Sequence, residues 1–475
     1  MADWYFGTVN DDYVVRVEWW FPGQGISIYD GGLGYDTIDF SDNPDSMIYF
    51  AYPLGWVQDP SIPLGYDEEL GQDIFAYALI GSFEHLIAGA GNDTIYAADS
   101  AMTLDGGLGN DIFLYAANHF DDGDHFEGNL GDDILDFSAD DFGCYVFDLV
   151  GETITDDHGW IATISGIENV TGSWGDDTLI LGADTNYLNG HVGHDFFDLS
   201  AGILTPQQTF IGGSGSDTLS FTDRSMAFYL DLSLGVMTWG ADAANFAYVY
   251  EMETVLAGGG NDNIIGTDFY NEVFGGGGDD RIDGLGGRDL LYGESGDDTI
   301  LGGSGRDKIY GGSGRDKLSG GAQKDVIFGN GGDDEILGGG GHDTQRGGGG
   351  ADTLRGENGR DRLSGGTGDD RLKGGAGQDL LIGGVGNDIL LGGDDSDSFR
   401  FSDAHGNDTI ADFDAADALE QIDFSRLSTI NDMSDLIAMS VDTAGGALIA
   451  TGASSSLLLS DVVVASLDST DFIFV

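Results

Sequence analysis

Aspartate recurs at every ninth residue through the second half of this 475-residue chain. Reading in nines from Ala257 to Arg400 gives sixteen units without an insertion, and fifteen of them carry Asp at the sixth position. These are Asp262, Asp280, Asp289, Asp298, Asp307, Asp316, Asp325, Asp334, Asp343, Asp352, Asp361, Asp370, Asp379, Asp388 and Asp397. The remaining unit has Asn271 instead. Stacked carboxylates repel one another unless a cation lies between them, so the pattern predicts an array of metal sites.

The rest of each unit indicates the elements that position these acids. A unit such as GGSGRDKIY (302–310) opens with glycines and has one apolar residue at its eighth position. A fixed period indicates a solenoid, in which glycine supplies the turns and a short tail forms a strand with one inward side chain. Two units then make one coil of eighteen residues, and aspartates eighteen apart lie above one another. Glycine turns also expose carbonyl oxygens, and carboxylate plus carbonyl oxygen favours calcium over magnesium or zinc.

The phrase GGxGxDxUx is similar to the nonapeptide of the repeats-in-toxin (RTX, hemolysin-type calcium-binding) proteins. This resemblance covers residues 257–400 and implies an all-β fold, a parallel β-roll solenoid of nine-residue half-coils. It implies several Ca²⁺ ions between successive same-edge turns, with the sixth-position aspartates as ligands. Gln323 and Asp395 depart from the pattern at glycine positions, and Gln345 stands at an inward apolar position, where we expect a locally loose coil.

Single copies of the phrase recur upstream, including GGLGYDTID (31–39), GNLGDDILD (128–136) and GGSGSDTLS (212–220). A longer repeat of about 84 residues contains acids eighteen apart, namely Asp93 with Asp111, Asp177 with Asp195, and Asp262 with Asp280. After an N-terminal lead (1–30), we interpret residues 31–256 as diverged RTX-like modules. Looped-out, β-rich inserts are expected at 40–87, 137–171 and 221–256. Each upstream pair is predicted to bracket one calcium ion.

Beyond Arg400 the glycine rhythm stops. Residues 401–475 resemble the β-rich C-terminal cap that follows the β-roll in serralysin-type secreted proteases. The ending DSTDFIFV resembles the uncleaved signal for type I secretion in that family. No Sec-type signal peptide and no run of eighteen apolar residues is visible. The resemblance therefore implies a secreted, extracellular bacterial protein that uses the type I secretion machinery and folds on extracellular calcium.

The charge of the chain limits its partners. Its formal net charge is −67, from 84 acids and 17 bases, which disfavours nucleic acid and anionic membranes. Fourteen bases lie between Arg281 and Arg400, and Arg288, Arg306 and Lys324 share the fifth position at intervals of eighteen. We expect these bases to neutralise neighbouring carboxylates. The alternative is a docking strip for an anionic surface glycan.

No HExxH, GxSxG or GxxxxGK[ST] motif is present, so no catalytic residue is assigned and no cofactor besides Ca²⁺ is expected. We predict a secreted, non-catalytic calcium-binding protein. Two alternatives remain, a cell-surface adhesin or layer-forming protein, and a glycan-acting enzyme with its site in the inserts of 40–256.

Overall fold

The structure is a computed structural model of the 475-residue chain. It describes residues 85–474 except 98–102, 116–121, 142, 184–186, 241–243 and 418, together with six strands before residue 82. Most of the first predicted insert and the copy at 31–36 lie outside the described residues. The chain divides into two units. Unit 1 comprises 1–221 and 242–252, and unit 2 comprises 222–241 and 253–475. Both are parallel β-solenoids with almost no helix.

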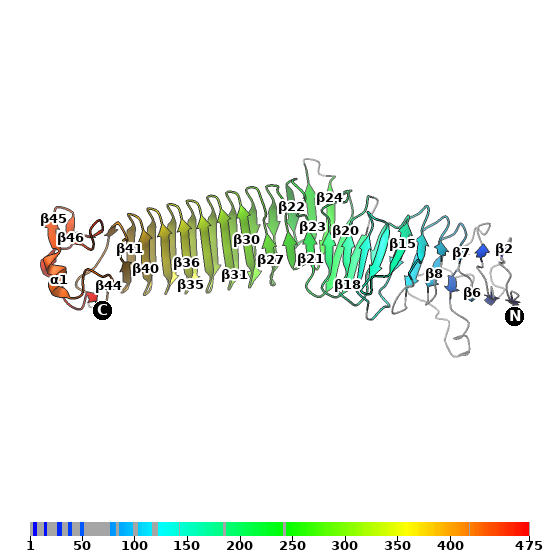
Figure 1. Ribbon diagram of the computed structural model, residues 1–475, viewed down its shortest axis with the longest axis horizontal. Helices are drawn as coiled ribbons and strands as arrows, with labels where there is room; N and C mark the ends of the chain where they lie inside the picture. The colour runs from blue at the N-terminus through cyan, green and yellow to red at the C-terminus, as the bar shows by residue number, and fades with distance from the viewer. Residues whose placement is uncertain are drawn as a thin grey trace. The chain divides into compact units, whose positions relative to one another are not determined.

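Unit 2 contains the regular array, in which consecutive coils stack as the two walls of a flattened solenoid (Figure 1). The strands before and within it are β22 (Phe228–Asp231), β23 (Val236–Trp239), β25 (Thr254–Leu256), β26 (Asn263–Ile265), β27 (Glu272–Phe274), β28 (Arg281–Asp283), β29 (Gly286–Gly287), β30 (Leu290–Ser295), β31 (Thr299–Gly305), β32 (Lys308–Ser313), β33 (Lys317–Ala322), β34 (Val326–Gly331), β35 (Glu335–Gly341), β36 (Thr344–Gly349), β37 (Thr353–Gly359), β38 (Arg362–Thr367), β39 (Arg371–Ala376), β40 (Leu380–Val385), β41 (Ile389–Asp394) and β42 (Ser398–Ser402).

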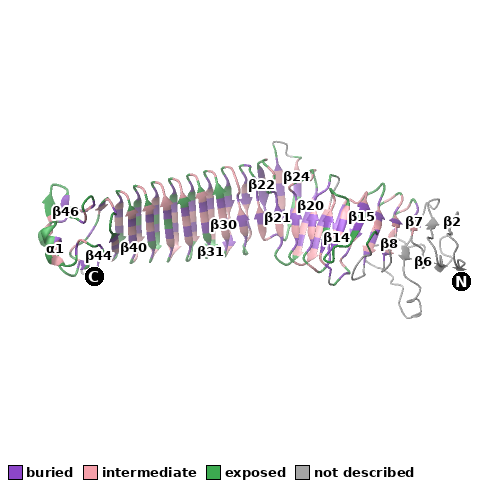
Figure 2. Cartoon of the chain, in the orientation of Figure 1, coloured by how far each residue is buried: buried purple, intermediate pink, exposed green. Residues whose placement is uncertain are grey.

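The eighteen-residue coil predicted from the sequence is confirmed by the strand register. Strands β30 and β32 pair in parallel with Leu291 opposite Ile309, and β32 pairs with β34 with Ile309 opposite Ile327. The eighth-position side chains are buried between the two walls, with Ile300, Ile309 and Ile327 fully excluded from solvent. Figure 2 shows these buried bands recurring at the same place in each coil. A coil therefore contributes only two apolar side chains to the core.

Glycine is required where the turns of successive coils approach each other. Gly305 has φ +147°, and a Cβ there would lie 1.6 Å from the carbonyl oxygen of Gly287. The two departures at glycine positions keep a positive φ, but at 80° for Gln323 and 74° for Asp395 they lie closer to the left-handed helical region than Gly305 does. Amide and short acidic side chains tolerate this region better than β-branched ones, although at some cost.

Unit 1 is also a parallel solenoid, but its coils are less regular. Its strands are β1 (Asp3–Phe6), β2 (Val14–Arg16), β3 (Ile26–Asp30), β4 (Thr37–Asp39), β5 (Ile48–Ala51), β6 (Tyr77–Gly81), β7 (His85–Ile87), β8 (Thr94–Ala97), β9 (Thr103–Asp105), β10 (Ile112–Tyr115), β11 (His125–Glu127), β12 (Ile134–Asp136), β13 (Tyr145–Asp148), β14 (Thr153–Asp156), β15 (Ile161–Ser165), β16 (Asn169–Thr171), β17 (Thr178–Ile180), β18 (Tyr187–Val192), β19 (Phe196–Asp198), β20 (Thr209–Ser214), β21 (Thr218–Ser220) and β24 (Phe246–Tyr250).

The insert at 137–171 joins the solenoid wall instead of looping out. Strands β13, β14 and β15 form an antiparallel meander, while β13 pairs in parallel with β17 and β15 pairs in parallel with β11. In unit 2 the hairpin of β22 and β23 behaves in the same way, because β22 also pairs in parallel with β26. Inserted residues therefore extend the walls, since a strand with apolar inward residues gains burial only by pairing with them.

The C-terminal region of unit 2 ends the stack with antiparallel strands. It contains β43 (Asn407–Ile410), β44 (Gln421–Arg426), α1 (Met433–Ala438), β45 (Ser440–Thr443), β46 (Gly446–Ala450), β47 (Ser456–Ser460), the 3-10 turn η2 (Val464–Ser466) and β48 (Phe472–Ile473). Strand β43 continues the wall from β41 and pairs in parallel with β47. Strand β47 is also the last strand of the antiparallel β45–β46–β47 meander. Helix α1 begins at Asp432, whose side chain accepts hydrogen bonds from two backbone amides. No helix in the part of the chain that the structure describes is long and apolar enough to cross a membrane.

Candidate calcium-binding columns

The sixth-position aspartates of the array form two continuous columns. In each column the backbone N–H of one aspartate donates to Oδ1 of the aspartate eighteen residues later; for example, Asp334 accepts from Asp316 and donates to Asp352, both at 2.9 Å. The same bond joins every consecutive pair from Asp262 to Asp388 in the first column and from Asn271 to Asp397 in the second, at 2.7–2.9 Å. One carboxylate oxygen of each aspartate is thus used by the turn itself.

The second carboxylate oxygen is buried and has no hydrogen-bond donor. This holds for Oδ2 of fourteen array aspartates. They are Asp280, Asp289, Asp298, Asp307, Asp316, Asp325, Asp334, Asp343, Asp352, Asp361, Asp370, Asp379 and Asp388, together with Asp262 at the start of the array. A buried carboxylate oxygen without a partner is costly, so the arrangement indicates a ligand that the protein atoms do not supply.

A backbone oxygen of the next coil faces the same space. A Cβ placed on Gly329 would lie 2.2 Å from Asp334 Oδ2 and 2.6 Å from the carbonyl oxygen of Gly347. The equivalent glycine of other units gives the same result, as at Gly302 between Asp307 Oδ2 and the Gly320 carbonyl. Glycine at the first position thus leaves a small cradle lined by oxygen atoms from two consecutive coils.

The electrostatics of the columns favour a bound cation. Burial, with help from neighbouring carboxylates, raises the pKa of Asp280 to about 8 and that of Asp316 and Asp370 to about 7. Burial also raises the pKa of Asp334, while the backbone bond from Asp316 opposes this shift. Without a cation, these carboxyl groups therefore resist ionisation near neutral pH. Carboxylate and carbonyl oxygens without imidazole or thiolate suit a hard cation, and the residues fit Ca²⁺.

Comparison with known families supports this chemistry. The model of the RTX calcium-binding nonapeptide repeat (four copies) matches residues 81–113, 165–203, 256–291, 284–318, 292–326, 310–345, 346–381 and 364–399. The chain is an RTX repeat protein. Its repeats are of the kind that binds Ca²⁺, and they form a β-roll solenoid.

The similarity of the chain to a solved structure is distant. The extracellular lipase LipA from Serratia marcescens is 21% identical over 45% of this chain, with a TM-score of 0.25. The match spans only 40% of the lipase chain. No curated protein matches the sequence.

The upstream aspartate pairs predicted from RTX copies are brought together. The backbone N–H of Asp93 donates to Asp111 Oδ1, and that of Asp177 donates to Asp195 Oδ1, both at 2.8 Å. These contacts reproduce the geometry of the array. However, Asp177 Oδ2 already accepts hydrogen bonds from the backbone N–H and hydroxyl of Ser173, at 2.6 and 3.0 Å. The second oxygen of Asp93 likewise accepts from Gly89 N–H at 3.1 Å.

Two members of the upstream columns, Asp133 and Asp217, lie outside the predicted spacing of eighteen residues. Asp111 N–H donates to Asp133 Oδ1 and Asp195 N–H donates to Asp217 Oδ1, at 2.7 and 2.8 Å. Both aspartates occupy the sixth position of a recognisable RTX copy, but they follow their partners by 22 residues. The interval of eighteen residues does not indicate them, although the sequence shows the RTX copies that contain them.

The residues that depart from the repeat pattern do not interrupt the strand pairing of the array. Asn271 is buried, and its Oδ1 accepts from Thr267 N–H at 2.7 Å. Gln345 is fully buried in the core, where its Nε2 donates to the Arg355 carbonyl at 2.8 Å. Strand β36, which contains Gln345, pairs in register with β34 and β38. The expectation of a loose coil at Gln345 is therefore wrong for the backbone. The hydrogen bond to the Arg355 carbonyl partly satisfies the buried side-chain amide, so the strand keeps its register.

The first column ends at a residue that the repeat pattern does not indicate. Asp388 N–H donates to Asp408 Oδ1 at 2.9 Å, and His405 Nδ1 lies 2.5 Å from Asp408 Oδ2. The other ring nitrogen of His405 lies 2.6 Å from the Thr451 hydroxyl. A buried histidine thus occupies the second oxygen of Asp408 and links the last coil to the C-terminal meander.

Proposed function

We propose that this RTX protein is a secreted, non-catalytic calcium-binding protein whose array folds when it meets extracellular calcium. The observation that carries the proposal is the row of buried, donor-free Oδ2 atoms, which from Asp280 to Asp379 lie beside a carbonyl oxygen of the next coil. The array aspartates from Asp262 to Asp397, and the pairs Asp93 with Asp111 and Asp177 with Asp195, are the proposed ligands. Bound Ca²⁺ supplies the positive charge that the columns need.

Stacking makes this folding cooperative. Each carboxylate cradle combines an aspartate of one coil with a carbonyl oxygen of the next, so ordering one coil prepares the site of its neighbour. Extracellular calcium modules bind at roughly 10⁻⁴ to 10⁻³ M, far above resting cytosolic levels. The same chain would then remain unfolded during export and fold outside the cell.

The export part of the proposal concerns residues 401–475 and the type I secretion machinery. Asp471 and Phe472 are buried, and β48 pairs with β44. Such a signal is accessible only before the cap folds, which agrees with calcium-driven folding after export. Removing residues 471–475 should retain the protein in cells with a type I exporter. Normal secretion of this truncation would remove the basis for the assigned route.

A structural or interaction role is proposed over catalysis because the inserts contribute strands to the walls. The β13–β15 meander and the β22–β23 hairpin both continue parallel ladders. A glycan-acting enzyme remains the competing hypothesis, and turnover of any member of a polysaccharide panel by the purified protein would support it. Calcium-dependent self-assembly or cell binding would instead favour an adhesin or layer-forming protein.

The calcium proposal is tested on the full chain by titration. Far-ultraviolet circular dichroism and calorimetry should show a sharp gain of β-structure with heat release on adding Ca²⁺. Mg²⁺ at the same concentration should not reproduce it, because Mg²⁺ requires a tighter octahedron and retains water. A complete β-roll spectrum in excess chelator would contradict the proposal.

A further inference from the structure

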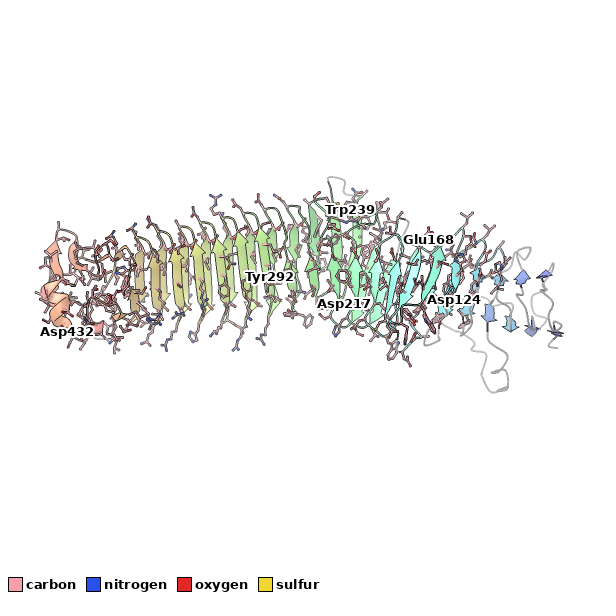
Figure 3. The ribbon with its side chains drawn as sticks, in the orientation of Figure 1. Asp124, Glu168, Asp217, Trp239, Tyr292 and Asp432 are labelled. Atoms are coloured by element: carbon pink, nitrogen blue, oxygen red, sulfur yellow. The ribbon has the colours of Figure 1, made fainter. Side chains whose placement is uncertain are left out.

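The two long edges of the array carry opposite charge. On one edge, the residue before each column aspartate is Arg288, Arg306, Lys324, His342 and Arg360 on five consecutive coils, and all five are exposed. On the other edge, the same position holds Asp279, Asp297, Arg315, Asp333, Ala351, Asp369 and Asn387. We call the first set, Arg288 to Arg360, the basic strip. Figure 3 shows side chains with nitrogen atoms projecting from the regular coils.

The basic strip forms no ion pair with a carboxylate among the described residues, although the charge of Lys324 offsets part of the rise in the pKa of Asp343. Among the described residues, lysine and arginine form two ion pairs, Arg315 with Asp297 at 3.2 Å and Arg400 with Asp423 at 2.7 Å. Neither pair involves the strip. The expectation that bases neutralise neighbouring carboxylates is met by direct contact at these two positions and, without contact, by the charge of Lys324 acting on Asp343. Cations without carboxylate partners in a chain of net charge −67 indicate an external anion.

The strip leads into a cavity beside the C-terminal cap. This cavity has a volume of about 530 Å³, and Lys324, His342, Arg360, Arg362 and Arg400 line it, with Leu419 of the cap at its side. Burial and the nearby Arg400 lower the pKa of Arg362, as expected where like charges are crowded. The size lies within the range of small-molecule sites.

Calcium would control the charge of this cavity. Asp343, Asp361 and Asp379 are also among the residues at the cavity, and all three belong to the second aspartate column. A cation bound to these aspartates would add positive charge beside the basic side chains. The cavity therefore attracts anions most strongly in the calcium-loaded protein.

The spacing of the strip suits a linear polymer. Stacked rings on this wall (Phe274, Tyr292, Tyr310 and Phe328) have centroids 4.6–5.0 Å apart, which measures the rise per coil. The strip thus offers one basic side chain about every 5 Å, a spacing that resembles the strand separation of a sheet. The ring faces cover one another, so they leave no platform on which bases of single-stranded nucleic acid stack. The dense charge of duplex nucleic acid is disfavoured by the negative chain.

We propose that the basic strip and its cavity bind an acidic polysaccharide, with one carboxylate or sulfate group contacting each coil. This inference rests on the calcium binding proposed above, since the calcium-loaded columns provide both the stack and the charge balance. The partner is recognised by charge and spacing, and the cavity holds one end of the bound segment or a branch of it.

The experiment measures binding of the calcium-loaded full chain to immobilised short oligosaccharides by interferometry. Heparin fragments supply sulfate groups, oligogalacturonate supplies carboxylates alone, and neutral dextran fragments and single-stranded DNA serve as comparison probes. The strip variant combines R306Q, K324Q and R360Q of the basic strip with R362Q of the cavity. Its matched control combines K317Q, R355Q, R371Q and K373Q, which removes the same charge from exposed residues of the other wall.

We expect at least one acidic oligosaccharide to bind, with the strip variant weakened about tenfold or more and the control changed less than about twofold. Which of the two acidic probes binds identifies the preferred anionic group. Equal weakening of both variants, binding of neither acidic probe, or tighter binding of DNA would overturn the proposal. Circular dichroism during calcium titration accompanies each protein. If the wild type binds no calcium, the proposed function fails; if it folds on calcium without binding either probe, only this inference fails.

Discussion

The regular array and the upstream modules contain the same kind of turn, but different side chains fill their cores. In the array (257–400), the core receives one side chain from each half-coil, and it is aliphatic, such as Ile309 or Leu318, everywhere except at Gln345 and Phe399. Upstream, aromatic side chains gather. Tyr115 stacks on Phe137 at 4.7 Å, and Phe137 contacts Tyr145 and Phe147 edge-on at 4.8 and 5.1 Å. Each buried aromatic ring contributes far more apolar area than one aliphatic residue.

The aspartates show the matching difference. In the array the second oxygen of Asp334 has no donor; upstream, those of Asp111 and Asp195 are likewise buried without a donor, but that of Asp177 is bonded to Ser173. The regular spacing of eighteen also lengthens to 22 at Asp133 and Asp217. We infer from this comparison that a solenoid with a thin core depends on cations in its turns, while one with an aromatic core satisfies some turns with its own groups.

Calcium removal should separate the two regions most clearly. In chelator, we expect amide hydrogens of the array to exchange at nearly unfolded rates, because its buried carboxylates lose their counter-charge. Residues 122–221 should keep substantial protection from their aromatic core. Hydrogen exchange with mass spectrometry measures both regions in one sample, with the calcium-loaded protein as control. Equal loss of protection in the two regions would contradict the contrast drawn here.

Removing one central ligand should have the next largest effect. Asp334→Ala takes an oxygen from its own cradle and breaks the bond from Asp316 N–H, so it disturbs the coils on both sides. We expect the calcium midpoint of folding to rise about threefold, through loss of nearest-neighbour coupling. Asp388→Ala, whose onward neighbour Asp408 is held by His405, should raise it less. A larger effect at Asp388, measured by circular dichroism, would argue against coupling along the column.

A single methyl group tests the cradle without removing a ligand. Gly329→Ala places Cβ 2.2 Å from Asp334 Oδ2, while Gly331→Ala in the same unit meets nothing closer than 3.8 Å. We expect the Gly329 variant to weaken calcium-induced folding about twofold or more and the Gly331 variant to leave it nearly unchanged. Calorimetric titration of both proteins gives the comparison, and equal behaviour would show that the cradle does not hold the ion.

The smallest expected effect concerns pH in the metal-free protein. Burial raises the pKa of Asp280 to about 8 and that of Asp316 to about 7, from an ordinary value of 3.8. Between these values the folded array binds more protons than the unfolded chain, so its stability falls as pH rises from about 4 to about 8. Metal-free protein should therefore show more β-structure at pH 5 than at pH 8. A spectrum that gains structure on raising the pH would reverse the predicted sign.

Strict periodicity made the array predictable from the sequence. Sixteen uninterrupted units define the coil length, and the eighth-position residues define the core. The pattern did not reveal that each aspartate also bonds the preceding coil through its Oδ1, because motif spacing contains no hydrogen-bond geometry. The upstream columns were only partly predicted, since inserted residues move Asp133 and Asp217 out of the expected interval.

The end of the first column could not be predicted at all. His405 and Asp408 lie after the last repeat, and Thr451 is 46 residues further along the chain from His405. Their contact depends on β43 pairing with β47, which no local pattern indicates. The tolerated Gln345 is a similar case, because its partner is the backbone carbonyl of Arg355 on the other wall.

The most direct test of the central claim is a crystal structure of the full chain grown with millimolar calcium, with anomalous diffraction to locate the ions. The account predicts an ion at about 2.3–2.6 Å from Asp334 Oδ2 and from the Gly347 carbonyl oxygen, repeated along both columns. Columns without anomalous peaks, with their Oδ2 atoms bonded to water or to protein donors, would contradict it.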